Sequence, residues 1–188
     1  MAVLDLSQIA PEAPRPITRD EYERLVSMGF FDEGEHVELL YGVLVRMTPQ
    51  NPPHSSVVEE LTETFVSKLI GRARVRIQLP FAASDDSEPE PDVAVVPLGD
   101  YTSKHPREAL LIVEVAHTSH RKDRNVKARL YAESGVPEYW LVDVPARAVE
   151  VYTGPRDGRY ESVVTCSSDD HIVLVHFPDV SLAVDDVF

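Results

Sequence analysis

Two acidic residues interrupt apolar segments in the middle of the chain. Asp92 opens the segment PDVAVV, and Glu114 lies inside LLIVEVA, 22 positions further on. Short, nearly continuous apolar segments are typical of strands buried on both faces of a sheet. A carboxylate is unfavourable there unless it is paired, protonated or bound to a cation. If the two strands are neighbours, both carboxylates can bind one oxygen-preferring cation such as Mg²⁺ or Mn²⁺, which would activate a water for phosphoryl chemistry.

Each acid also has a purely structural interpretation. Asp92 can cap the entrance of its strand, and Glu114 can pair with a buried arginine such as Arg74 or Arg129. The order of elements around the two acids favours the metal site over either interpretation taken alone. That order is helix, strand, strand with Asp, strand with Glu, helix, strand.

Periodicity and turn residues predict the elements that would position these acids. Helices are expected from the capping-box pattern at Thr18 to near Gly29, over residues 54–70, and over residues 122–134. The segment VELLYGVLVRM predicts two short strands joined at Tyr41-Gly42. Further strands are expected in ARVRIQLPF, PDVAVV, ALLIVEVA, EYWLVDV, AVEVY, GRYESVVTC, HIVLVHF and VSLAV.

The ordered set PDVAVV, LLIVEVA, D-R-N-V-K and YAESGVPEYWLVD resembles the Uma-type putative restriction endonuclease family of the PD-(D/E)XK nuclease superfamily, over about residues 18–155. The family also has counterparts of Glu38, Gly42 and His54. The resemblance implies an α/β fold with a restriction-endonuclease-like core, a mixed central β-sheet flanked by helices (αβββαβ). An N-terminal helix and hairpin and C-terminal antiparallel strands complete it. It also implies that Asp92 and Glu114 bind a divalent metal and that a lysine assists catalysis.

One departure from the superfamily pattern concerns this lysine. The position two residues after Glu114 is Ala116, so the lysine of E-x-K is absent from the strand. The Uma-type family resembles this arrangement, with its lysine on the following helix, which makes Lys127 the expected substitute. The alternative is an ordinary surface pair of Asp123 with Lys127 at i, i+4, worth roughly 0.3–0.5 kcal/mol.

Four further side chains are candidates for supporting roles. His54 is expected to contact phosphate, position a water or simply start its helix. Glu38 is expected to add a third carboxylate or to orient a ligand, with structural pairing to an arginine as the alternative. His117 and His120 follow Glu114 at i+3 and i+6, but an extended strand does not aim these positions at one zinc ion. The expected catalytic set is therefore Asp92, Glu114, Lys127, Glu38 and His54.

Composition bounds the class of protein. The 188 residues, 43% hydrophobic and 27% charged, fit one globular domain over residues 18–188, preceded by a mobile arm over residues 1–17 that contains three prolines. The chain has no apolar run long enough for a membrane span and no signal-peptide pattern, so a cytoplasmic protein is expected. The single Cys166 excludes an internal disulfide and a thiolate zinc site.

Net charge argues against broad electrostatic attraction to nucleic acid, because the chain carries a formal charge of −14. A local basic face is still possible around Asp123, in the cluster Arg121, Lys122, Arg124, Lys127 and Arg129. The leading hypothesis is a Mg²⁺- or Mn²⁺-dependent endonuclease acting on DNA. The alternatives are a non-catalytic nucleic-acid- or protein-binding module on a nuclease scaffold, and a metal hydrolase for small phosphoesters. A homodimer is expected because most soluble oligomers are twofold.

Overall fold

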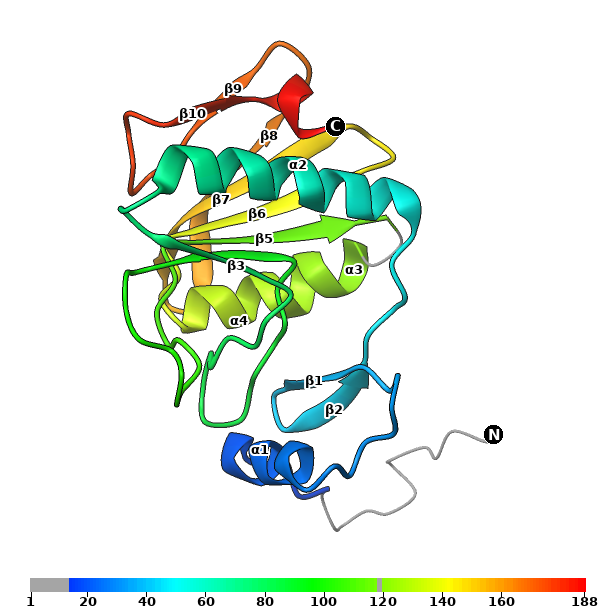
Figure 1. Cartoon of the computed structure of the whole chain (residues 1–188). Helices are drawn as coiled ribbons and strands as arrows, with labels where there is room; N and C mark the ends of the chain where they lie inside the picture. Colours follow the sequence, from blue (N-terminus) through cyan, green and yellow to red (C-terminus); the bar gives the residue numbers. More distant parts are fainter. Residues whose placement is uncertain (1–13, 118–119) are drawn as a thin grey trace.

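A six-stranded mixed sheet forms the centre of the molecule, with helix α2 on one face and helices α3 and α4 on the other (Figure 1). The computed structural model describes residues 14–117 and 120–188. Alternate residues of the central strands enter different cores. Val93, Val95 and Val113 pack with α2, whereas Ala94 and Ile112 pack with α4. Burial on both faces explains why these strands read as continuous apolar runs.

The sheet has the strand order β3-β4-β5-β6-β7-β8, and only β5 and β6 pair in parallel. The expected mixed sheet flanked by helices is thereby confirmed. The strand bounds are β3 Arg74–Ile77, β4 Val93–Val96, β5 Leu111–Ala116, β6 Glu138–Asp143, β7 Ala148–Arg156 and β8 Arg159–Cys166.

Helices α1 and α2 each begin after a side chain that caps the first turn. Helix α1 (Arg19–Ser27) has a complete capping box between Thr18 and Glu21. Helix α2 (Pro52–Leu69) starts two residues before the expected His54, because two prolines are favourable in the first turn and Asn51 supplies the cap. The expected helix over residues 122–134 is interrupted: α3 (His120–Lys122) leads into the π-helical segment η2 (Asp123–Lys127) and then α4 (Ala128–Glu133).

A hairpin of β1 (Val37–Leu40) and β2 (Val43–Arg46) lies with α1 below the main sheet (Figure 1). Its two-residue turn places Tyr41 at φ 49° and Gly42 at φ 73°, as the Tyr41-Gly42 pattern predicted. The hairpin is tied to the rest of the chain by backbone hydrogen bonds in both directions between Leu39 and Glu88. It therefore carries its side chains toward the segment that leads into β4.

The C-terminal segment adds a second small sheet beside α2, formed by β9 (His171–Val173) and β10 (Ser181–Ala183) and followed by the 3₁₀ turn η3 (Val184–Val187). The strand expected in HIVLVHF ends at Val173, after which the chain turns and Phe177 packs into the core. Cys166 is half-buried at the end of β8, where burial raises the pKa of its thiol.

Two expectations concern the N-terminus and membranes. The expected arm over residues 1–17 falls largely on residues 1–13, which lie outside the described residues. Within the described chain, no helix is both long and apolar enough to cross a membrane.

Candidate active site

The antiparallel pairing of β4 with β5 brings Asp92 and Glu114 to neighbouring positions. Val93 pairs with Val113 in antiparallel register. Asp92, the residue before Val93, therefore lies opposite Glu114, the residue after Val113. Asp92 Oδ2 accepts a hydrogen bond of 2.8 Å from the Val115 amide. Both carboxyl groups line the same pocket. Asp92, which directly precedes β4, thus lies next to Glu114 on β5, and their sharing of one cation stays a prediction.

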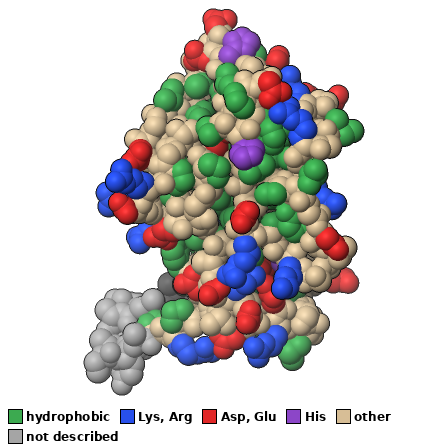
Figure 2. Space-filling model, turned by 90° about the vertical axis from the view of Figure 1, so that its left-hand side faces the viewer, with side chains coloured by type: hydrophobic (Ala, Val, Ile, Leu, Met, Phe, Trp, Pro, Cys, Tyr) green, Lys and Arg blue, Asp and Glu red, His purple; other side chains and the backbone are tan. Residues whose placement is uncertain are grey.

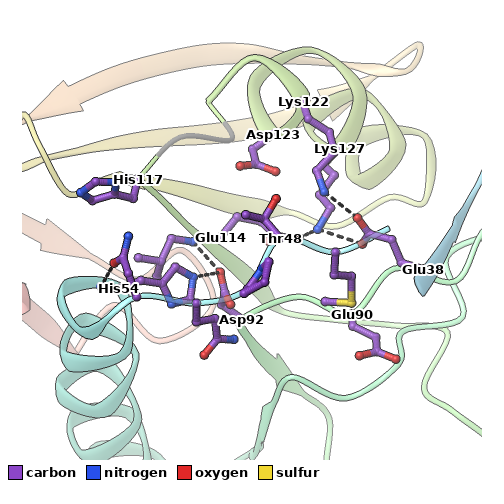
Figure 3. A pocket seen from close by; sticks show the side chains of 15 residues that line it. Glu38, Thr48, His54, Glu90, Asp92, Glu114, His117, Lys122, Asp123 and Lys127 are labelled. Atoms are coloured by element: carbon purple, nitrogen blue, oxygen red, sulfur yellow. Dashed lines mark hydrogen bonds and ion pairs between the residues drawn. The ribbon is translucent and has the colours of Figure 1, made fainter. Parts of the chain in front are cut away.

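Helix α2 supplies a second contact to Asp92. His54 stands in the first turn of α2, where its amide is capped by Asn51 Oδ1 at 3.1 Å. Its Nε2 lies 3.1 Å from Asp92 Oδ2 (Figure 3). His54 therefore contacts a candidate metal ligand in addition to standing at the start of its helix.

Glu114 is paired with groups from the following helix. Its Oε1 accepts hydrogen bonds from Lys127 Nζ at 2.8 Å and from the Tyr131 hydroxyl at 2.5 Å. The alternative partners considered from sequence lie elsewhere. Arg129 pairs with Glu133, and Arg74 lies over the ring of Tyr101.

Lys127 reaches this position from the π-helical segment η2, in which the Ala128 amide donates to the Asp123 carbonyl. Both Lys127 and Asp123 are only 3% exposed, so the interpretation as a surface i, i+4 pair is wrong. Lys127 Nζ also lies 3.0 Å from Glu38 Oε2. One ammonium group therefore contacts two buried carboxylates.

Glu38 enters the site from hairpin strand β1 and is fully buried. Its Oε1 accepts a hydrogen bond of 2.8 Å from Lys122, so its partners are two lysines and not the arginine considered as an alternative (Figure 3). The hairpin turn is anchored to α4, because the Tyr41 hydroxyl donates to Glu133 at 2.7 Å. The hairpin and the helix thus position Glu38 together.

Glu38, His54, Asp92, Glu114 and Lys127 line a pocket of about 80 Å³. The segment from Met47 to Asn51 forms another part of its wall. Three charged lining residues were not predicted from the sequence as members of a site. Glu90 precedes Pro91-Asp92. Lys122 and Asp123 were noted only as part of the basic cluster, and the sequence did not predict that their side chains line the pocket. Among the described residues, the pocket has five carboxylates and two ammonium groups: Glu38, Glu90, Asp92, Glu114, Asp123, Lys122 and Lys127.

Burial and the two lysines together set the pKa values of the acids in the pocket. Burial is the main reason that the pKa of Glu114 is raised to about 8; Lys127 opposes this rise, and the neighbouring acids add to it. Burial alone would lower the pKa of Lys127, but Glu114, Glu38 and Asp123 raise it above its usual range. Burial also acts to raise the pKa of Glu38, but its two lysines outweigh this and hold it below the usual value. The two ammonium groups of the described pocket are thus fewer than its five carboxyl groups.

The donor set fits a magnesium-type ion better than zinc. Within the described residues, no group of three or more His, Cys, Asp or Glu side chains is arranged to hold a metal ion. Asp92 and Glu114 lie together in the pocket, and Mg²⁺ is commonly held by one or two carboxylates with several waters retained. His117 lines the pocket, whereas residues 118–119 and the side chain of His120 lie outside the described part.

Comparison with known proteins agrees with this architecture. The sequence matches the family Uma2, described as putative restriction endonuclease, over residues 19–185. The chain belongs to the Uma2 family. A crystal structure of a putative nuclease belonging to DUF820, from Anabaena variabilis, superimposes on this Uma2 chain with a TM-score of 0.74 and 20% sequence identity, and the match covers 92% of this chain and 98% of that chain. This similarity shows a shared fold. A search of curated proteins returned no match.

Proposed function

We propose that this Uma2 protein is a divalent-metal-dependent endonuclease that hydrolyses DNA phosphodiester bonds. The observation that carries the proposal is the convergence of Asp92, Glu114 and Lys127 in one buried, carboxylate-rich pocket. The excess of carboxylates over ammonium groups favours a bound cation, and the family description as restriction endonucleases supports a nucleic-acid substrate.

Asp92 and Glu114 would hold the cation, Mg²⁺ or Mn²⁺. When bound, such an ion lowers the pKa of water and stabilises the charge that develops on a phosphoryl group. The protein prepares these ligands: the Val115 amide and His54 orient Asp92, and Lys127 and Tyr131 orient Glu114. Lys127 would replace the strand lysine missing at position 116 by neutralising charge beside Glu114.

A second candidate is a non-catalytic binding module on the same scaffold. The net charge of −14 favours it, because phosphate affinity comes mainly from Lys and Arg. On the face drawn in Figure 2, basic side chains lie among acidic ones rather than in one broad basic field. If the protein cleaves DNA, the lysines that bind the phosphates are expected to lie close to the pocket.

The experiment that separates the two is cleavage of a DNA duplex with Mg²⁺, followed for the wild type and for Asp92→Asn. Asn keeps an oxygen that can accept the Val115 amide, but it removes the charge of one metal ligand, so cleavage should fall by roughly 10²-fold or more while the thermal midpoint stays close to wild type. Cleavage by the wild type that is insensitive to chelators or to Asp92→Asn contradicts the proposed site. DNA binding without any cleavage supports the non-catalytic module instead.

A further inference from the structure

The helix after β5 presents two lysines to the pocket, although they are five positions apart. In a regular α-helix of 3.6 residues per turn, such residues point in directions about 140° apart. The π-helical segment η2 instead has i→i+5 hydrogen bonding, as between Ala128 and Asp123, which brings residues five apart toward one face. Lys122 and Lys127 both project toward Glu38 as a result (Figure 3).

The two lysines differ in solvent exposure and in the number of carboxylates that they contact. Lys127 is 3% exposed and lies between the carboxylates of Glu38 and Glu114. The side chain of Lys122 is 29% exposed at the pocket, and its contact is the hydrogen bond of 2.8 Å to Glu38. If Lys122 leaves Glu38, this fully buried carboxylate keeps Lys127 as its partner. Lys122 can therefore move without leaving a buried carboxylate unpaired. Lys127 cannot, because Glu114 would lose its ammonium partner.

We propose that Lys122 is a substrate-binding residue whose ammonium leaves Glu38 to bind a non-bridging oxygen of a DNA phosphate, while Lys127 stays paired with Glu114. The inference rests on the proposed function. An anionic substrate that approaches a pocket lined by five carboxylates needs a cation at its entrance, and Lys122 is the more exposed of the two lysines that line the described pocket. Glu38 acts as a positioning residue that holds this lysine ready.

The test is the salt dependence of DNA-duplex binding, measured with Ca²⁺ in place of Mg²⁺. Each phosphate contact contributes about 0.9 to the slope of log affinity against log salt concentration. Lys122→Met should therefore lower the slope by about 0.9 and weaken binding roughly eightfold at ~0.1 M salt. Lys122→Arg should retain the slope of the wild type. Lys68→Met is the matched control, since this exposed lysine stands in the last turn of α2, at the opposite end of the helix from His54.

A merely structural role for Lys122 would change thermal stability without changing the slope. If Lys122→Met fails to fold, Lys122→Gln is measured in its place: a slope lowered by about 0.9 supports the proposal, and an unchanged slope contradicts it. Equal slopes for the wild type and both Met variants, with Mg²⁺-dependent cleavage intact in the wild type, overturn the role of Lys122 and leave the proposed function standing. A wild-type protein that neither binds nor cleaves DNA overturns both.

Discussion

At the scale of residues, the pocket is organised around one buried cation that serves several acids. Lys127 contacts Glu38 and Glu114 at 3.0 Å and 2.8 Å, and removing one partner of a buried ion pair is far more costly than removing a surface charge. The same ammonium that would assist catalysis therefore also stabilises the metal-free protein.

Lys127→Met should separate these two contributions. In EDTA the free energy of unfolding should fall by about 3–5 kcal/mol, because buried Glu114 loses its ammonium partner and Glu38 keeps only Lys122. Excess Mg²⁺ should restore part of this loss, since a divalent cation supplies the missing charge. Turnover with Mg²⁺ should fall by roughly 10²-fold. Chemical unfolding with and without Mg²⁺ measures the first two effects, with Lys68→Met as control; unchanged stability in EDTA would contradict the buried pairing.

Asp92 and Glu114 could be recognised from sequence because an acid inside an apolar strand violates the pattern around it. Lys122 and Glu90 could not be assigned, since their positions depend on contacts between distant segments. Glu38 was recognised only through the family resemblance, and its lysine partners depend on how a hairpin docks against a helix. Nothing in helical periodicity distinguishes a π-helical segment from an α-helix when both lie within one predicted helix.

At the scale of elements, the hairpin β1–β2 is the part that delivers Glu38. Its turn packs closely on the segment before α1: a Cβ atom added at Gly42 would lie 2.3 Å from Pro16 Cβ. Its strand β1 is joined to Glu88, a buried acid whose Oε2 lies 3.9 Å from Arg19 Nη1. The position of the hairpin is therefore sensitive to both contacts.

Gly42→Ala should move or loosen this hairpin. The substitution adds strain at φ 73° and a clash with Pro16, whereas Gly29→Ala at φ 65° meets no atom within 4 Å. Both variants should lose about 1 kcal/mol from the left-handed conformation, and Gly42→Ala should lose about 1–3 kcal/mol more from overpacking, together with cleavage activity. Equal destabilisation of the two variants would show that the hairpin does not depend on the Pro16 contact.

Glu88 should make stability depend on pH. Burial, followed by the neighbouring Glu23, raises its pKa to about 7 from 4.5. Between these values the folded protein holds a proton that the unfolded chain has released, so stability is present below pH 4.5 and is lost as pH rises to about 7, by up to about 3 kcal/mol. Glu88→Gln should flatten this dependence and be the more stable form at pH 8, whereas exposed Glu60→Gln should not. A wild-type stability that rises over this interval would refute the assignment to Glu88.

At the scale of the whole molecule, most of the architecture followed from periodicity, because burial on both sheet faces and helix capping are local signals. The division of the C-terminal strands between two sheets did not, since strand pairing partners depend on which edge is already covered. The main sheet ends in β3 and β8, and β8 exposes Val163 and Val164.

We propose a homodimer, because uncovered sheet edges tend to pair and twofold assembly is the commonest closed arrangement. Light scattering at micromolar concentration should give a mass twice the 21.0 kDa of one chain, and a charge-introducing Val163→Lys substitution should reduce it if β8 is the interface. A mass near that of one chain for the wild type would exclude the dimer under these conditions.

The proposed function requires that Asp92 and Glu114 together bind a divalent cation. Anomalous diffraction from a crystal soaked in Mn²⁺ tests it most directly. We expect a manganese peak within coordination distance of both carboxylates, absent from a crystal of Asp92→Asn treated in the same way. Manganese bound elsewhere with these two carboxylates empty, or a peak that persists in Asp92→Asn, would contradict it.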